Sequence, residues 1–80
     1  KNTLYYCEKA SLEIRVNLFD DAIKTAGQCI AVDPKLGEGY MFLGLAQCLK
    51  GDKATGRQNL QKAKDLGDTQ AQELIDKYAN

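Results

Sequence analysis

The chain has 80 residues, of which 44% are hydrophobic, and its 11 basic residues are balanced by 11 acidic ones. This length predicts one small domain, and the zero net charge gives no field that would attract nucleic acid, an anionic membrane surface or an acidic substrate. The longest uncharged apolar run, 39–49, is far shorter than the ~20 residues needed to span a bilayer, so we expect no membrane insertion.

Histidine is absent, and the three cysteines, Cys7, Cys29 and Cys48, form no C-x-x-C pair. The commonest general base and the usual activator of a nucleophilic Ser or Cys are therefore missing, and a zinc site would have to combine distant thiols with carboxylates. The thiols are expected to be free and buried, which favours a reducing compartment such as the cytoplasm. We accordingly predict a protein that is not an enzyme and that has no metal or cofactor.

The first two predicted elements are helices over about 3–15 and 19–32. In the second helix, apolar residues recur with the spacing i, i+3, i+4, i+7 and i+11, which places them on one face. These residues are Phe19, Ala22, Ile23, Ala26 and Ile30. Asp33-Pro34 ends the helix, because proline has no N–H to continue the hydrogen-bond ladder. The break between the two helices is so short that an antiparallel pair is expected.

Three more helices are predicted over about 36–50, 53–66 and 69–79. Gly51 is expected to end the third helix in a left-handed conformation, and Asp52 to cap the fourth. Gly67 ends the fourth helix in the same way, and Asp68 or Thr69 is expected to cap the fifth. Thr69 and Gln72 have the spacing of a capping box.

The stretch from Gly51 to Gln58 also has glycines spaced as in G-x-x-x-x-G-K-[ST], a loop that binds phosphate. Arg57 stands in place of the lysine, and Gln58 replaces the hydroxyl that would bind Mg²⁺. A strand should precede such a loop, but 40–49 contains no Val, Ile or Thr. The helix-turn-helix interpretation is therefore preferred to nucleotide binding.

Comparison of the chain with itself shows a period of 34 residues. This shift aligns small residues with small residues at three places: Ala10 with Gly44, Ala22 with Gly56, and Cys29 with Ala63. Small side chains are needed where two helices approach most closely, so their recurrence at one period predicts that the same helix pair is built twice. The units are 1–34 and 35–68, and 69–80 forms a closing helix within the single domain 1–80.

The second unit resembles the tetratricopeptide repeat (TPR), whose pattern is W-x₂-L-G-x₂-Y, then A-x₃-F, then P. The matching residues are Tyr40, Leu43, Gly44 and Gln47, then Gly56 and Leu60, then Ala63, with Asp68 in place of the closing proline. The first unit matches through its second helix, whereas Lys9 and Glu13 occupy usually apolar positions of its first. The resemblance implies an all-α, right-handed α-solenoid of antiparallel helix pairs, here with five helices.

The resemblance also implies a protein-protein interaction scaffold that binds a peptide or protein segment on its concave face. In the proposed register, the first helix of each pair and the closing helix line a mainly apolar groove. The residues expected there are Leu4, Cys7, Met41, Leu45, Cys48 and Ile75, together with Ser11, Ile14, Glu38, Gln72 and Ala79. These side chains could not hold a partner's carboxylates. The other interpretation is that the same apolar stripes only pack within or between repeats.

A second hypothesis is a structural or spacer part of a longer helical-repeat protein, with no ligand of its own. The two ends of the stack distinguish the hypotheses: polar residues on the outside of 69–79 would cap it, whereas uncovered Tyr5 and Leu12 would indicate further repeats before the first helix. Self-association could also cover such a face. The basic residues around 50–64 are expected to form a solvated outer face, because no aromatic side chain lies among them to stack on bases.

Overall fold

The computed structural model describes residues 3–80, with side chains from residue 5 onward. The groove residue Leu4 therefore lies outside the described side chains. Over this range the chain forms five helices and no strand, which confirms the all-α prediction. They are α1 (Thr3–Arg15), α2 (Phe19–Val32), α3 (Gly37–Lys50), α4 (Lys53–Asp65) and α5 (Ala71–Tyr78). None of these helices has the length and hydropathy of a membrane-crossing segment.

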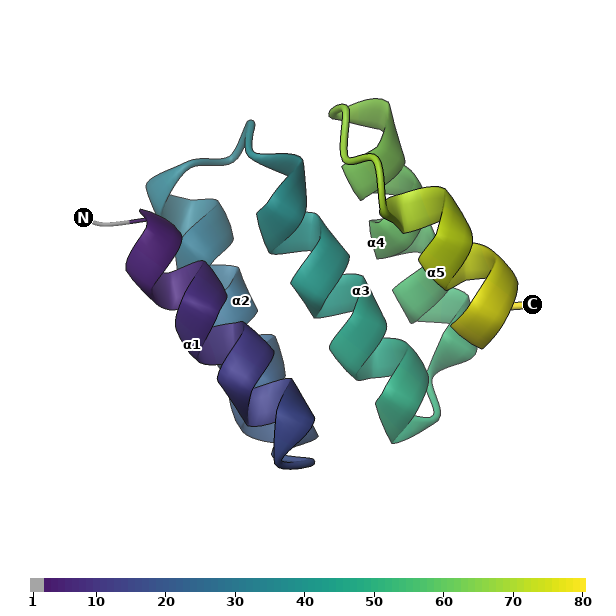
Figure 1. The fold of residues 1–80 in the computed structure, drawn as a ribbon, viewed down its shortest axis with the longest axis horizontal. Helices are drawn as coiled ribbons and strands as arrows, with labels where there is room; N and C mark the ends of the chain where they lie inside the picture. The colour runs from purple at the N-terminus through teal and green to yellow at the C-terminus, as the bar shows by residue number, and fades with distance from the viewer. Residues whose placement is uncertain (1–2) are drawn as a thin grey trace.

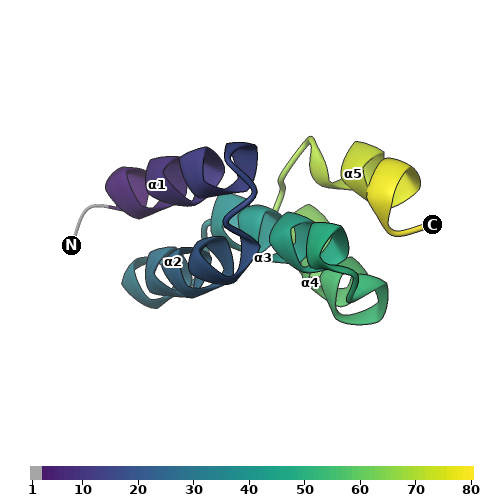
Figure 2. The ribbon, with the colours of Figure 1, turned by 90° about the horizontal axis from the view of Figure 1, so that it is seen from below.

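The helices form two antiparallel pairs, α1–α2 and α3–α4, followed by α5 (Figure 1). Seen along the slab, α1 and α5 lie on one side, α2 and α4 on the other, and α3 between them (Figure 2). The Cα atoms extend over 33 × 26 × 16 Å. A thickness of 16 Å fits two layers of helices, because packed helix axes lie about 8–10 Å apart and Cα atoms lie about 2.3 Å from each axis.

Three helix ends use the same capping geometry. Gly51 and Gly67 adopt positive φ values of 114° and 99°, as predicted. The residue after each glycine donates its N–H to a carbonyl five positions back: Asp52 to Gln47 at 2.9 Å, and Asp68 to Ala63 at 2.9 Å. These bonds satisfy carbonyl groups that the helix leaves unpaired.

The end of α1 has this geometry too, with Asn17 at φ 65°. The N–H of Leu18 donates to the carbonyl of Glu13 at 2.8 Å. Asparagine adopts the left-handed region more readily than most residues with a side chain, which explains how α1 ends without glycine. Asn17 and Gly51 are 34 residues apart, so this cap is a further match at the period of the repeat.

The start of α5 differs from the prediction. The helix begins at Ala71, two residues later than expected, and Gln70 at its N-cap makes no side-chain capping bond. The carboxylate of Asp68 instead accepts the N–H of Gln70 at 2.8 Å, which holds the chain in a turn before the helix. The capping box of Thr69 and Gln72 is therefore not formed. The predicted cap of α4 is confirmed, since Asp52 Oδ1 accepts the N–H of Thr55 at 3.3 Å.

The small residues predicted to recur are all buried. Ala10, Ala22, Cys29 and Ala63 have no exposed surface, and Gly44 and Gly56 are buried. A Cβ atom added to Gly44 would lie 2.7 Å from the carbonyl oxygen of Gly56 and 2.8 Å from Cγ of Leu60. The backbones of α3 and α4 thus approach too closely for any side chain at this point.

The cysteines differ from the prediction of three free thiols. Cys7 of α1 and Cys29 of α2 form a disulfide with their Cα atoms 5.7 Å apart, and only Cys48 is free among the described cysteines. The sequence alone could not show this pairing, because it depends on how α1 packs on α2. The cysteine content therefore no longer points to a reducing compartment.

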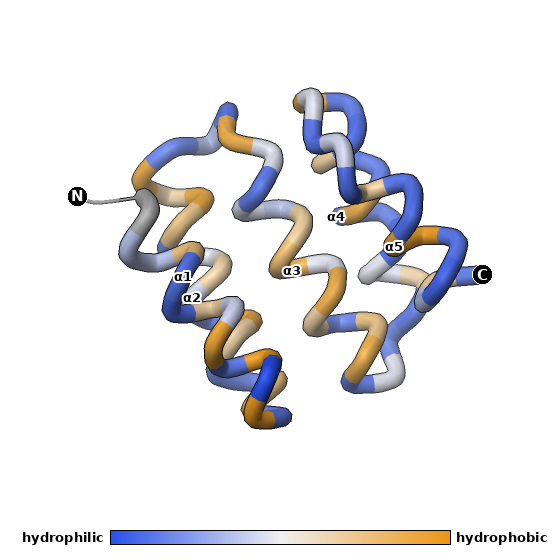
Figure 3. Tube along the Cα trace, in the orientation of Figure 1, coloured by the Kyte–Doolittle hydropathy of each residue, from blue (hydrophilic) through white to orange (hydrophobic). Residues whose placement is uncertain are grey.

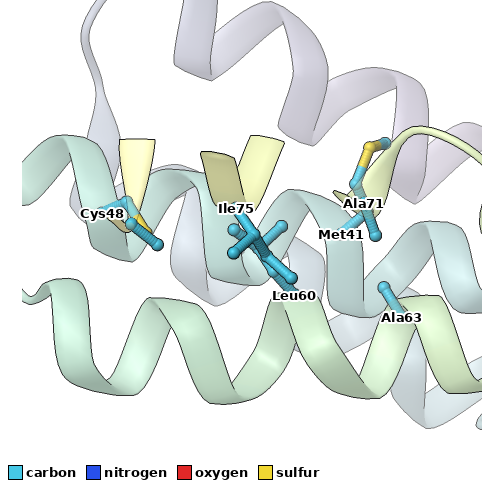
Figure 4. Close-up of a cluster of buried hydrophobic side chains, with 7 residues drawn as sticks. Met41, Cys48, Leu60, Ala63, Ala71 and Ile75 are labelled. Carbon is cyan, nitrogen blue, oxygen red and sulfur yellow. The ribbon is translucent and has the colours of Figure 1, made fainter. Parts of the chain in front are cut away.

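A cluster of buried hydrophobic side chains lies among α3, α4 and α5 (Figure 4). Leu60 of α4 and Ile75 of α5 lie close together in it, with Met41 and Cys48 of α3 on either side. Figure 3 shows that apolar residues run along most of α3, the helix with neighbours on both flanks. This cluster fixes α5 against the second pair and leaves one line of α3 open to solvent.

Candidate functional site

The candidate site is a hollow on the side of the molecule where α1 and α5 stand above α3 (Figure 2). Its lining residues are Cys7, Glu8 and Ser11 from α1, and Glu38 and Phe42 from α3. Its volume is about 210 Å³, which is below the ~300 Å³ typical of small-molecule pockets. The space would hold one side chain of a bound segment better than a cofactor or a metabolite.

An apolar line on α3 extends the floor of the hollow. Phe42, Leu45 and Leu49 follow Glu38 at i+4, i+7 and i+11, so all four residues share one face of the helix. Each is half-buried. We call the hollow and this line the α3 groove.

Most of the groove residues expected from the sequence are in the core. Met41, Cys48 and Ile75 are between 3% and 5% exposed and do not line the hollow, so the expectation is corrected for these three residues. Cys7 is 1% exposed, but it forms part of the lining of the hollow. Met41, Cys48 and Ile75 pack between α3 and α5, and Cys7 is joined to Cys29 beneath the hollow. Of the six principal groove residues, Leu45 is half-buried and remains a candidate.

The remaining expected groove residues divide between surface and core. Ser11 and Glu38 line the hollow, Ile14 is half-buried, Gln72 is exposed, and Ala79 is buried in the cluster of α3, α4 and α5.

Sequence reasoning missed Glu8 of α1 and two residues of α3, Phe42 and Leu49. Phe42 and Leu49 are the immediate neighbours of Met41 and Cys48. The apolar residues of α3 occur all around the helix, so their periodicity cannot distinguish the line that faces solvent from the line that faces α5. No local signal identifies it. The position of α5 decides the matter, because that helix covers Met41 and Cys48 and leaves Phe42 at the edge of the cluster.

The charge of the groove comes from two carboxylates. Glu8 is exposed and Glu38 is half-buried, and neither carboxylate makes a hydrogen bond or ion pair with another described residue. Together with Phe42 they form a surface that is apolar at its floor and negative at its rim. Such a surface would repel an anionic ligand and attract a segment with a basic residue next to an apolar one.

The only free thiol in the described part of the chain is poorly suited to chemistry. Burial raises the pKa of the Cys48 thiol, and the nearby carboxylate of Asp52 raises this pKa further, against a smaller opposing effect of Lys53. A raised pKa keeps the group as a thiol, whereas the nucleophile and the metal ligand are the thiolate. Residues 3–80 also contain no cluster of three or more His, Cys, Asp or Glu residues placed to hold a metal ion.

The two ends of the stack differ in polarity. On α5 and at its N-cap, the polar residues are exposed, as expected for a polar outer face: Gln70, Gln72, Glu73, Asp76 and Lys77. On α1, Tyr5 and Leu12 are more than half exposed. The basic residues Lys50, Lys53, Arg57, Lys62 and Lys64 are all exposed, as expected for a solvated surface.

Two proteins of Saccharomyces cerevisiae are similar to this chain in sequence. Small glutamine-rich tetratricopeptide repeat-containing protein 2 is 28% identical over 74 residues, which cover 92% of this chain and 21% of that protein. Heat shock protein STI1 is 29% identical over 65 residues, which cover 81% of this chain and 11% of that protein. The chain thus spans about a fifth or less of the relatives that it matches.

No family model matches the chain, and no solved structure gives a significant match. The similarity to a tetratricopeptide repeat-containing protein over nearly the whole chain, together with the arrangement of the five helices, confirms an all-α helical-repeat fold that is TPR-like. The division into two repeats and a closing helix stays a prediction.

Proposed function

We propose that this chain is a protein-protein interaction module that binds an extended segment of another protein in the α3 groove. The observation that carries the proposal is the line of half-buried apolar side chains on α3. The carboxylates of Glu8 and Glu38 lie beside the N-terminal end of this line. Binding of a partner segment to such a surface is strengthened by burial of an apolar side chain, and the charges make the binding selective.

The partner segment that fits best carries a large apolar side chain for the hollow and a Lys or Arg beside it. The two carboxylates argue against a segment that is recognised by its own carboxylates, including a free C-terminus. Similarity to a tetratricopeptide repeat-containing protein supports protein binding as the general function. Neither enzymatic activity nor nucleic-acid binding is part of the proposal.

A selection from a displayed library of random peptides tests this proposal. We expect wild-type protein to enrich peptides with an apolar residue next to a basic one, and their binding to weaken as salt rises, because exposed charges are screened. The charge reversal Glu8→Lys plus Glu38→Lys should abolish binding of these peptides. It leaves the core intact, since neither side chain is in the buried cluster.

The control is Arg57→Glu on α4, which changes an exposed charge outside the groove. This variant should bind the selected peptides as wild type does. Phe42→Ala should weaken binding by about tenfold, the effect of losing ~1.4 kcal/mol from an interfacial aromatic side chain. Enriched peptides that bind the charge-reversed protein equally well would refute the groove.

The competing function is a structural segment of a longer helical-repeat protein. The exposed apolar residues Tyr5 and Leu12 on α1 favour this alternative, because a neighbouring repeat would cover them. If the selection enriches no peptide while circular dichroism shows a folded helical protein, this structural function is the better conclusion.

A further inference from the structure

The Cys7–Cys29 disulfide lies next to the hollow of the α3 groove. Cys7 belongs to the lining of this hollow, together with its neighbour Glu8 on the same helix. On the side of α3, a Cβ atom added to Gly39 would lie 3.5 Å from Sγ of Cys29. Gly39 directly follows Glu38, which lines the hollow from α3. The disulfide therefore lies where α1, α2 and α3 meet, at the helix positions that form the hollow.

The N-terminal half of α1 depends on the disulfide for its attachment. Among the described side chains of this helix, only Cys7 and Ala10 are buried, and burial of an alanine side chain contributes little to stability. Glu13 adds a buried carboxylate oxygen that has no hydrogen-bond partner among the described residues. The C-terminal end of α1 is joined to α2 through the short connection 16–18. The disulfide holds the other half, which is the part of α1 that lines the hollow.

The helices beneath α1 leave no space into which the sulfur atoms could move. Ala22 and Ala26, on the same face of α2 as Cys29, have no exposed surface. A Cβ atom on Gly39 would lie 2.9 Å from Cγ1 of Ile30, so α2 and α3 are closely packed here. The cluster among α3, α4 and α5 contains no residue of the described part of α1. If the bond between the sulfur atoms were broken, α1 is thus the helix that could move away.

We propose that this disulfide is a site of reversible thiol–disulfide exchange that controls the α3 groove, an inference that rests on the proposed function of that groove. With the bond intact, Glu8 and Glu38 are held on the two sides of the hollow, where a basic and an apolar side chain of the partner fit between the helices. Reduction releases the N-terminal half of α1 from α2 and α3. The hollow then loses one of its walls, and the affinity for the partner segment falls.

A dithiol reductant supplies the electrons for this step. One of its thiolates attacks Sγ of Cys7, the cysteine that borders the hollow, because Cys29 has no exposed surface. A bond forms between the reductant and Cys7, the bond to Cys29 breaks, and Cys29 leaves as a thiolate that takes up a proton. The second thiol of the reductant then displaces Cys7 as a thiol. The reductant becomes a disulfide, and the protein gains two electrons and two protons.

Peptide binding under two redox conditions tests the proposal. A displayed random-peptide library is selected against the oxidised protein, and the affinity of the enriched peptides is measured for the oxidised and the reduced forms. We expect binding to the reduced form to be weaker by at least tenfold. By linkage, a saturating peptide should favour the disulfide over the dithiol by the same factor, and tenfold corresponds to a reduction potential lower by about 30 mV. Equal affinity for the two forms would overturn the proposal.

Hydrogen exchange tests the release of α1 without any peptide. Reduction should speed exchange of the amides around Glu8 and Ser11 by roughly tenfold or more, while the amides around Leu60 of α4 keep their protection. Unchanged exchange in α1 would refute the redox control. Loss of protection throughout the chain would refute it too, because the disulfide would then support the whole fold. If the library yields no peptide, the proposed function fails, and this measurement still decides whether reduction releases α1.

Two variants serve as controls for the cysteine that is responsible. Cys7→Ala plus Cys29→Ala should bind the enriched peptides as weakly as the reduced wild type does, and should not respond to the reductant. Cys48→Ala keeps the disulfide and changes a buried thiol that does not line the hollow. It should bind as wild type does and respond to the reductant as fully. A response of the double variant to the reductant would assign the effect to Cys48 and contradict the proposal.

Discussion

The two helix pairs share one arrangement but are held together by different interactions. In α1–α2, alanines occupy the close-packed positions 10 and 22, and a disulfide joins Cys7 to Cys29. In α3–α4, glycines at 44 and 56 bring the backbones together, and Met41 and Ala63 occupy the positions equivalent to the two cysteines. The pair α1–α2 thus has a covalent link at the positions where α3–α4 relies on close packing.

The polar residues at the two interfaces show the same contrast. In α3–α4, Nδ2 of Asn59 donates to Oε1 of Gln47 at 2.7 Å and to the carbonyl of Thr55 at 3.3 Å. The equivalent of Gln47 in α1 is Glu13, whose Oε1 is buried and has no hydrogen-bond partner among the described residues. The first pair thus has a buried polar atom without a hydrogen-bond partner among the described residues, and its helices are held together by a cross-link.

Removal of the disulfide should have the largest effect. The link closes a loop between residues separated by 22 positions, for which chain entropy predicts a stabilisation of about 3 kcal/mol. We expect Cys7→Ala plus Cys29→Ala to lower the free energy of unfolding by this amount in chemical denaturation. A dithiol reductant should destabilise wild type similarly and leave the double variant unchanged. A wild-type protein that is insensitive to the reductant would contradict the comparison.

The close approach of α3 and α4 gives the next largest effect. A Cβ on Gly56 would overlap Sγ of Cys48 and lie 2.7 Å from the carbonyl oxygen of Gly44, so Gly56→Ala should destabilise by about 2 kcal/mol. The matched change in the first pair, Ala22→Gly, should cost about 1 kcal/mol through backbone entropy and lost packing. Thermal unfolding followed by circular dichroism measures both. Stabilisation by Gly56→Ala would show that the helices have room to separate.

Replacement of the polar interface residue by Met should change the free energy of unfolding in opposite directions in the two pairs. Glu13→Met replaces a carboxylate whose Oε1 is buried without a partner among the described residues by an apolar side chain of similar length, and should stabilise by about 1 kcal/mol. Gln47→Met removes a satisfied hydrogen bond and should destabilise by about 1 kcal/mol. Denaturation of both variants under oxidising conditions tests this difference. If both variants changed the free energy of unfolding in the same direction, hydrogen bonding of the buried polar residue would not distinguish the two interfaces.

Substitutions at the C-terminal caps of α1 and α3 should have the smallest effect on stability. Asn17 has φ 65°, where glycine is less strained, so Asn17→Gly should stabilise by about 0.5 kcal/mol. Gly51 has φ 114°, outside the region that asparagine readily adopts, so Gly51→Asn should destabilise by a similar amount. Differential scanning calorimetry can resolve these shifts, and a destabilised Asn17→Gly variant would count against the shared cap.

Much of the fold could be predicted from the sequence, because helix boundaries depend on neighbouring residues. Asp33-Pro34 and Gly51-Asp52 ended and began helices where expected. The predicted start of α5 was wrong, since the carboxylate of Asp68 accepts a hydrogen bond in a turn before the helix and the capping box is not formed. The candidate site was harder to predict, and Met41 and Phe42 show why: they are adjacent and both apolar, yet only one is buried by α5.

The sequence by itself determined five helices, the caps at Gly51, Asp52 and Gly67, and the 34-residue period, because these follow from local backbone preferences and from the spacing of small residues. Only the tertiary structure decided that Cys7 pairs with Cys29, that Oε1 of Glu13 is buried without a hydrogen-bond partner among the described residues, and that Phe42 lines the α3 groove. Each of these depends on where a second helix lies relative to the first. Such a position is set by the packing of residues far apart in the chain, which no local pattern contains.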